Sequence, residues 1–251
     1  MSDFATSSGH WYRQDGEPMY TIVGKNGKER PTTLRDARQH GLVPSVTTVI
    51  RMAAAPALEK WKRNQLLMAA LTLPRAANES ETEWLVRVER DWQDEGRAAA
   101  DKGTAIHGAI ERHYRGEMPE ADYWDWVKVA RNAIENTCGH DNLWKPERSF
   151  AHPMGYGGKT DLHSSAWVLD FKSKDGVEDA KVYDEHTMQL AAYRRGLGVP
   201  GARCGIVFID RQSPTVRLVE VPEADLVSGL RMFDALLSFW QAKNGYMLEA
   251  A

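Results

Sequence analysis

Residues 158–172 read GKTDLHSSAWVLDFK, and this stretch decides the fold of the segment around it. It predicts a strand, a short turn and a second strand, with Asp161 on the first and Asp170 and Lys172 on the second. Side chains alternate along a strand, so Asp170 and Lys172 leave one face about 6–7 Å apart. The apolar side chains of the second strand leave its other face: Trp167, Leu169 and Phe171. Two carboxylates that converge beside a lysine suit a divalent metal that is bound through oxygen and activates water.

The length of the chain favours a single domain. It has 251 residues, 42% of them hydrophobic, which is enough to bury a substantial core, and it shows no repeat or linker. We expect four parts within that domain. They are an N-terminal hairpin and extended segment, a helical part, a sheet core and a closing helix, over residues 1–50, 51–140, 145–222 and 223–251.

The composition excludes several classes of protein. No apolar run approaches the roughly 20 residues that span a bilayer, and the start of the chain lacks the apolar stretch of a signal peptide. We therefore expect a soluble, cytoplasmic protein with no membrane partner. The two cysteines, Cys138 and Cys204, lie far apart, which excludes a four-cysteine zinc or iron–sulfur site. The net charge of −3 indicates that any grip on nucleic acid is local or short.

The order of periodic segments indicates the fold class. A hairpin is expected around 11–23, with its turn at 24–27, and polar residues follow up to Pro44. Thr104, after Gly103, is expected to cap a separate helix. The remaining expected helices cover 57–71, 81–100, 106–114, 123–136, 182–197 and 223–245, and the strands cover 148–152, 159–164, 167–173, 203–210 and 215–221. The expected order is a run of helices and then a short sheet, with one helix between its strands and another after them. This order predicts an α/β or α+β fold.

Two further pairs of residues support a metal and nucleic-acid site. His107 and Glu111 are four residues apart on one predicted helix, so both can reach a metal, or His107 can bind it while Glu111 orients a ligand. Gln189 and Tyr193 have the same spacing on the helix that follows the strand pair. An amide and a phenol at that place can contact a phosphate or stack under a base of DNA.

Together these residues resemble a known superfamily, the PD-(D/E)XK nucleases. Asp161 followed by Asp170-x-Lys172 matches its pattern, with Thr160 in place of the proline. The motifs Gly103-xxx-His107 and Gln189-xxx-Tyr193 are similar to those of the RecB-type branch. The stretch Pro44-Ser45-Val46-Thr47-Thr48, ahead of a helix with a tryptophan, resembles phage-type and mitochondrial genome-maintenance single-strand DNA exonucleases. The resemblance covers most of residues 40–200.

The resemblance implies a restriction-endonuclease-like core, in which a short mixed sheet of about four strands is flanked by helices, behind a helical N-terminal half. It implies one or two Mg²⁺ or Mn²⁺ ions and hydrolysis of DNA from single-stranded ends, in replication, recombination or repair in a phage or bacterium. A recombinase or a single-strand-binding protein is a candidate partner. Some relatives carry an iron–sulfur cluster on four cysteines, which two cysteines cannot supply.

The expected mechanism assigns a role to each residue. Asp161 and Asp170 bind the ion, and the ring of His107 and the backbone carbonyl of Phe171 complete its ligands. Lys172 positions or deprotonates the attacking water and stabilises the transition state. The first acidic residue of the superfamily pattern is Glu111, Glu147 or neither. The alternatives are a structure-specific or restriction-like endonuclease and a non-catalytic DNA-binding scaffold on the same fold.

Overall fold

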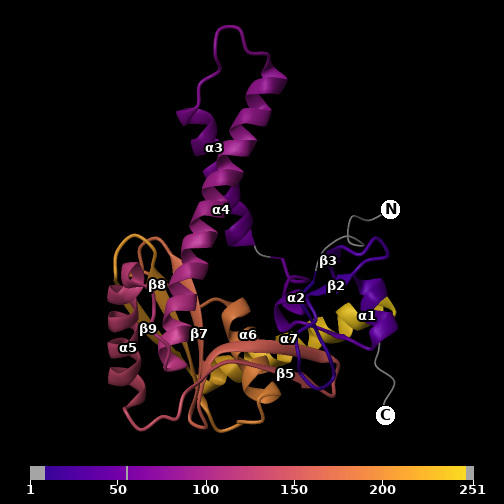
Figure 1. Ribbon diagram of the computed structural model, residues 1–251, viewed down its shortest axis with the longest axis vertical. Coiled ribbons are helices and arrows are strands. Elements are labelled where there is room, and N and C mark those ends of the chain that lie inside the picture. The colour runs from indigo at the N-terminus through magenta and orange to yellow at the C-terminus, as the bar shows by residue number, and fades with distance from the viewer. Residues whose placement is uncertain (1–8, 55, 247–251) are drawn as a thin grey trace.

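A mixed five-stranded sheet organises the protein (Figure 1). The computed structural model describes residues 9–54 and 56–246. The strands lie in the order β5-β6-β7-β8-β9, and their bounds are Lys145–His152, Tyr156–His163, Trp167–Lys174, Arg203–Asp210 and Val216–Val221. Only β7 and β8 are parallel, because the chain crosses between them through a helix. The predicted mixed sheet flanked by helices is confirmed, with β5 and β9 at its edges.

Helices cover both faces of the sheet. One core lies under α2 (Val46–Ile50), α6 (Asp184–Gly196) and α7 (Glu223–Asn244), and the other lies under α4 (Glu81–Tyr114) and α5 (Trp124–Cys138). Each fully buried aliphatic or aromatic side chain contributes roughly 1.5–3 kcal/mol, so the two cores hold the sheet from both sides. A shorter 3-10 turn, Ala121–Tyr123, leads into α5.

Strand β7 has the alternation that the sequence predicts. Its apolar odd-numbered residues Trp167, Leu169 and Phe171 belong to the core under α4 and α5. Val168 belongs to the opposite core, and Asp170 lies on the same side as Val168 by alternation. The strand is buried on both faces over its first five residues. The polar pair Asp170 and Lys172 is therefore held between packed layers, near α6.

One predicted helix boundary is wrong. The chain forms a single helix, α4, of 34 residues, where separate helices were expected over 81–100 and 106–114. Thr104 does not cap a helix, because its hydroxyl donates to the carbonyl of Ala100 within the helix. Gly103 allows close packing and does not mark a break, since an added Cβ would overlap Ser173 Oγ on β7. The true start of α4 has Ser80 as its N-cap.

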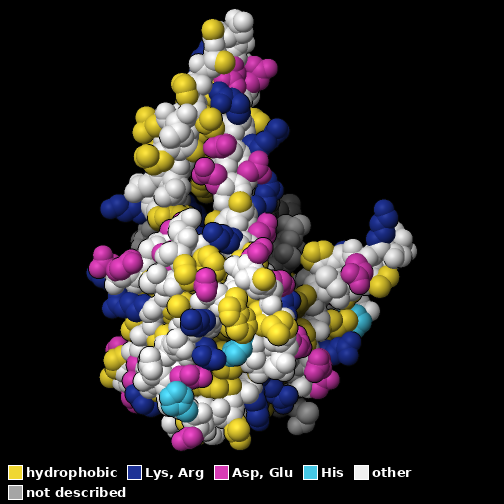
Figure 2. Space-filling view, turned by 60° about the vertical axis from the view of Figure 1, so that its left-hand side comes forward, with side chains coloured by type: hydrophobic (Ala, Val, Ile, Leu, Met, Phe, Trp, Pro, Cys, Tyr) yellow, Lys and Arg dark blue, Asp and Glu magenta, His cyan; other side chains and the backbone are white. Residues whose placement is uncertain are grey.

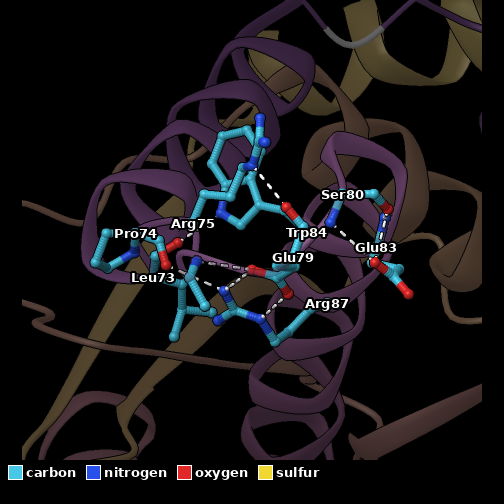
Figure 3. A network of polar contacts seen from close by, with 9 residues as sticks. Leu73, Pro74, Arg75, Glu79, Ser80, Glu83, Trp84 and Arg87 are labelled. Carbon is cyan, nitrogen blue, oxygen red and sulfur yellow. Dashed lines mark hydrogen bonds and ion pairs between the residues drawn. The ribbon is translucent and has the colours of Figure 1, made fainter.

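Helix α3 (Pro56–Thr72) and the first half of α4 form a hairpin that projects from the body (Figure 1). Polar contacts hold its turn together (Figure 3): Arg87 donates to both oxygens of Glu79 at 2.7 Å, and the indole of Trp84 donates to the Leu73 carbonyl at 2.6 Å. Apolar side chains remain exposed along the hairpin (Figure 2), namely Trp61, Leu66, Leu67, Met68, Leu71, Leu85 and Val86.

The N-terminal part differs from its prediction in two respects. The turn at 24–27 is confirmed, but it joins β2 (Thr21–Val23) to β3 (Glu29–Pro31). The expected first strand, β1 (Trp11–Tyr12), pairs with β4 (Val43–Pro44) instead. The polar segment after the turn contains the short helix α1 (Leu34–His40), which no apolar periodicity announced. A capping box between Thr33 and Asp36 starts that helix.

The other elements lie close to their predicted positions. The remaining strands and α5, α6 and α7 begin and end within three residues of the expected bounds. Within residues 9–54 and 56–246, no helix combines the length and the apolar character needed to cross a membrane.

Candidate active site

The site lies where β6 and β7 part. These strands pair at only two positions, Leu162 with Leu169 and His163 with Val168. Just beyond the last pair, the carboxylate of Asp161 accepts a hydrogen bond from the Phe171 N–H at 2.6 Å. The side chain thus takes the place of a ladder hydrogen bond. The ladder therefore ends next to Asp161, on the strand beside the one that carries Asp170.

The N-terminal segment covers the edge of β6 that this separation exposes. Ser45, at the start of α2, makes a parallel bridge with Gly157. A Cβ at Gly157 would lie 2.9 Å from the ring of Tyr12, so glycine lets that ring lie directly on the strand. The site therefore has β6 and the N-terminal segment on one side, and β7 and α6 on the other.

A polar network joins the buried Asp170 and Gln189 to the partly exposed Lys172. The ammonium Nζ of Lys172 lies 2.7 Å from Asp170 Oδ2 and donates to Gln189 Oε1 at 3.0 Å. The amide Nε2 of Gln189 donates to Asp170 Oδ1 at 2.7 Å and to the hydroxyl of Tyr193 at 2.9 Å. Burial alone would lower the pKa of Lys172, but the neighbouring Asp170 carboxylate outweighs it, and the pKa is raised. Lys172 is thus held as a charged donor in a fixed position.

The surroundings of Asp161 favour its neutral form, whereas those of Lys172 favour its charged form. Burial and, after it, the charge of Asp170 raise its pKa to about 7, although the Phe171 N–H and Lys172 act against this. Near neutral pH the site therefore holds a proton that a cation would displace, because a positive charge favours the ionised carboxylates.

His107 reaches the same region from α4. Its ring packs edge-on against Phe171, with 5.8 Å between ring centroids. Burial lowers its pKa to about 4, so the imidazole is neutral. Its Nε2 atom is buried and has no hydrogen-bond partner among the described residues. A buried polar atom without a partner is costly, and here it is consistent with a missing ligand.

Both candidate glutamates have cationic partners. Glu111 forms an ion pair with Arg115, one turn further along α4. Glu147 pairs with Lys159, and in β5 it occupies the position across from Asp161. Its φ of 51° is unusual for a residue other than glycine, and it interrupts the β5–β6 ladder at that point. A role for either glutamate at a metal remains a prediction.

The donor set fits a hard divalent cation, although the ligands are not gathered as a finished cage. Among the described residues, no three histidine, cysteine, aspartate or glutamate side chains lie close enough together to hold a metal ion. The carboxylates are instead occupied by the Phe171 N–H and by Lys172. The unpartnered nitrogen of His107 and the proton held at Asp161 are the features that a cation would satisfy.

The structure places Gln189 and Tyr193 differently from what their spacing suggested. They share a helix face as predicted, but they are only 7% and 5% exposed, and Gln189 bonds to Asp170 and Lys172. Their predicted contact with DNA stays a prediction. The carbonyl of Phe171 as a metal ligand also stays a prediction, since the structure gives a partner here to its N–H.

Three residues that the N-terminal segment brings to the site gave no signal in the sequence. Tyr12, Tyr20 and His10 lie beside β6, about 140 residues away in the chain. No local spacing signals such a contact. The sequence predicted a strand at Trp11, but it assigned that strand to a hairpin over residues 11–23. In the structure the strand pairs with Val43–Pro44.

Comparison with known proteins gives limited similarity. No protein-family model matches this sequence, and no curated protein matches it. Among solved structures, a candidate exonuclease from Eubacterium rectale is 13% identical with a TM-score of 0.42, over 57% of this chain and 68% of that one. An alkaline exonuclease from Laribacter hongkongensis is 13% identical with a TM-score of 0.29, over 74% of this chain and 98% of that one. Similarity at this level carries no argument about activity.

Proposed function

We propose that this protein is a metal-dependent deoxyribonuclease that hydrolyses phosphodiester bonds at the ends of single-stranded DNA. One observation supports this above the others. Two carboxylates, the partly buried Asp161 and the buried Asp170, lie with Lys172 at the point where two strands part. Removing ionisable groups from water is costly, and clusters of such groups with shifted pKa values are commonly found at catalytic sites.

The residues divide the chemistry among them. Asp161, Asp170 and His107 would hold Mg²⁺ or Mn²⁺, as one or two ions, which polarises the phosphate and acidifies a bound water. Lys172 keeps its proton at Nζ and presents a positive charge to the phosphate oxygens that become more negative during the reaction. Gln189 holds Lys172 and Asp170 in register through its two amide atoms. The neutral ring of His107 brings no competing charge.

The substrate and the setting are part of the proposal. A net charge of −3 supports a short contact with a strand end over a long grip on a duplex. We propose a cytoplasmic role in DNA replication, recombination or repair of a phage or bacterium, with a recombinase or a single-strand-binding protein as partner.

A digestion series tests the activity. Labelled linear single strands, linear duplex and closed circular single strands are incubated with Mg²⁺, Mn²⁺ or EDTA. We expect metal-dependent loss of linear strands, with circles spared, and the order of products gives the polarity. Cleavage of circles would make the protein an endonuclease. No cleavage from a folded protein that still binds DNA would favour a scaffold role.

The variant Lys172→Ala tests the assignment of the site. We expect the rate of cleavage to fall by about 10²–10⁴-fold, the range for removing a positioned proton-transfer or charge-stabilising group. DNA binding in EDTA and the melting temperature should change little by comparison. The control is Lys128→Ala, which removes an exposed lysine of α5. Full activity in Lys172→Ala would remove this lysine from the mechanism.

A further inference from the structure

An exposed aromatic stack lies at the start of the described chain. The rings of His10 and Tyr20 are stacked, with centroids 4.4 Å apart and planes 27° from parallel. The hydroxyl of Tyr20 is hydrogen-bonded to that of Tyr12 at 2.7 Å. Tyr12 is only 2% exposed and anchors the pair, whereas His10 is exposed. The imidazole is therefore the solvent-exposed member of the stack.

Backbone contacts fix this stack beside the candidate active site. The carbonyl of His10 accepts from the Ser45 N–H at 2.8 Å, and Ser45 bridges to Gly157 on β6. The neighbouring Gly158 lies against the ring of Tyr193, since a Cβ there would be 2.7 Å from it. Tyr193 is bonded to Gln189, which holds the catalytic pair. The stack and Tyr193 thus contact consecutive residues of β6, the strand that also carries Asp161.

Two cations lie near the stack, Arg51 and Lys159, and Lys159 is also ion-paired with Glu147. Lys159 follows Gly157 by two residues on β6, so it leaves the same face as the glycine on which Tyr12 rests. Arg51 is exposed at the C-terminal end of α2. Partial burial lowers the pKa of His10, and the charges of Arg51 and Lys159 lower it further, which keeps the imidazole neutral. A neutral aromatic face between cations suits a nucleobase and its phosphates.

We propose that His10 and Tyr20 form a stacking subsite for a base of single-stranded nucleic acid, with Arg51 and Lys159 on the adjacent phosphates. This inference rests on the proposed function and specifies its substrate. In a duplex both faces of an internal base are covered by its neighbours, so an unpaired or terminal base is required. Stacking discriminates little among bases, so the subsite supports digestion without regard to sequence.

Binding in EDTA tests the subsite without cleavage. The probe is a fluorescent single-stranded oligonucleotide, titrated with wild-type protein and with His10→Ala, His10→Phe and Tyr20→Phe. We expect His10→Ala to weaken binding by about 5- to 100-fold, in the range for loss of one stacking aromatic side chain. His10→Phe and Tyr20→Phe keep the rings and should bind nearly as wild type does. The control His40→Ala removes an exposed histidine at the end of α1.

An abasic oligonucleotide shows that a base is the ligand. Single abasic positions are moved along the probe, and one of them should weaken binding to the wild type but leave His10→Ala unaffected. Arg51→Gln should reduce the slope of log affinity against log salt by about 0.7 without changing this pattern. Equal losses with abasic probes for both proteins would overturn the subsite.

The outcomes separate this inference from the proposed function. Cleavage of linear strands with Mg²⁺ but no effect of His10→Ala on binding would refute the subsite and leave the nuclease intact. Binding that depends on His10 with no cleavage under any condition would refute the nuclease, and the subsite would stand as a single-strand-binding site. If His10→Ala has a lower melting temperature than His40→Ala, His10→Phe decides between lost stacking and lost folding.

Discussion

Replacing Asp161 by Asn tests whether the folded protein raises the pKa of this carboxyl group as the structure indicates. The pKa of Asp161 is raised from 3.8 to about 7, mainly by burial and then by Asp170. The folded protein therefore holds this proton more tightly than the unfolded chain. The resulting stabilisation is complete below the unfolded pKa and is lost as the pH rises through the folded value. The shift corresponds to roughly 4 kcal/mol, at about 1.4 kcal/mol for each pKa unit.

The assay is thermal melting in EDTA between about pH 5 and about pH 8. Asn keeps an oxygen for the Phe171 N–H but has no proton to lose. Relative to the variant, the wild type should lose roughly 3 kcal/mol across this window, or about 6–12 °C in melting temperature for a chain of this size. The control is Asp175→Asn. Arg211 lowers the pKa of Asp175, so this carboxylate stays ionised across the whole window and the difference from the wild type should stay constant. Parallel pH curves for the wild type and Asp161→Asn would refute the reasoning.

Three further predictions concern the same region. Mg²⁺ at about pH 8 should raise the melting temperature of the wild type as the ion fills its site, and it should raise that of Asp161→Asn much less. Equal shifts in the two proteins would show that the cation binds elsewhere. Gln189→Leu should lower kcat by about 10-fold or more with little change in KM, because it removes the partner that orients Lys172. A loss confined to DNA affinity would instead support the predicted DNA contact. Gly103→Ala should lower the free energy of unfolding by about 1–2 kcal/mol, because the added methyl group overlaps Ser173. Most of this loss should disappear when Ser173→Ala is also present. Urea unfolding of the wild type, the two single variants and the double variant would measure both effects.

The sheet core was the most predictable part of the protein because its signals are local. Trp167, Leu169 and Phe171 alternate with Val168, Asp170 and Lys172, and alternation places the first set together in one core. The placement of Asp170 beside Lys172 follows from the same rule. Helix boundaries were less secure, since Gly103 permits either a helix end or close packing. Only the contact with Ser173 shows that Gly103 serves close packing and does not end a helix.

The composition of the candidate site could be predicted only in part. Asp161 and Asp170 follow from two adjacent strands, and His107 from its motif. The network around Gln189 could not be read from its spacing with Tyr193, because that spacing defines a helix face and not what lies opposite it. The state of each proton also depends on burial, which acts through all neighbouring elements.

The sequence alone was enough to place the strands of the main sheet, most of the helices and the candidate site residues. It did so because periodicity, capping and side-chain chemistry act over a few neighbouring residues. Only the tertiary structure decided that β6 and β7 part at Asp161, and that a segment near residue 10 fills the exposed edge. Both are contacts between segments far apart in the chain, and their formation depends on which surfaces remain unpaired after the local elements have folded.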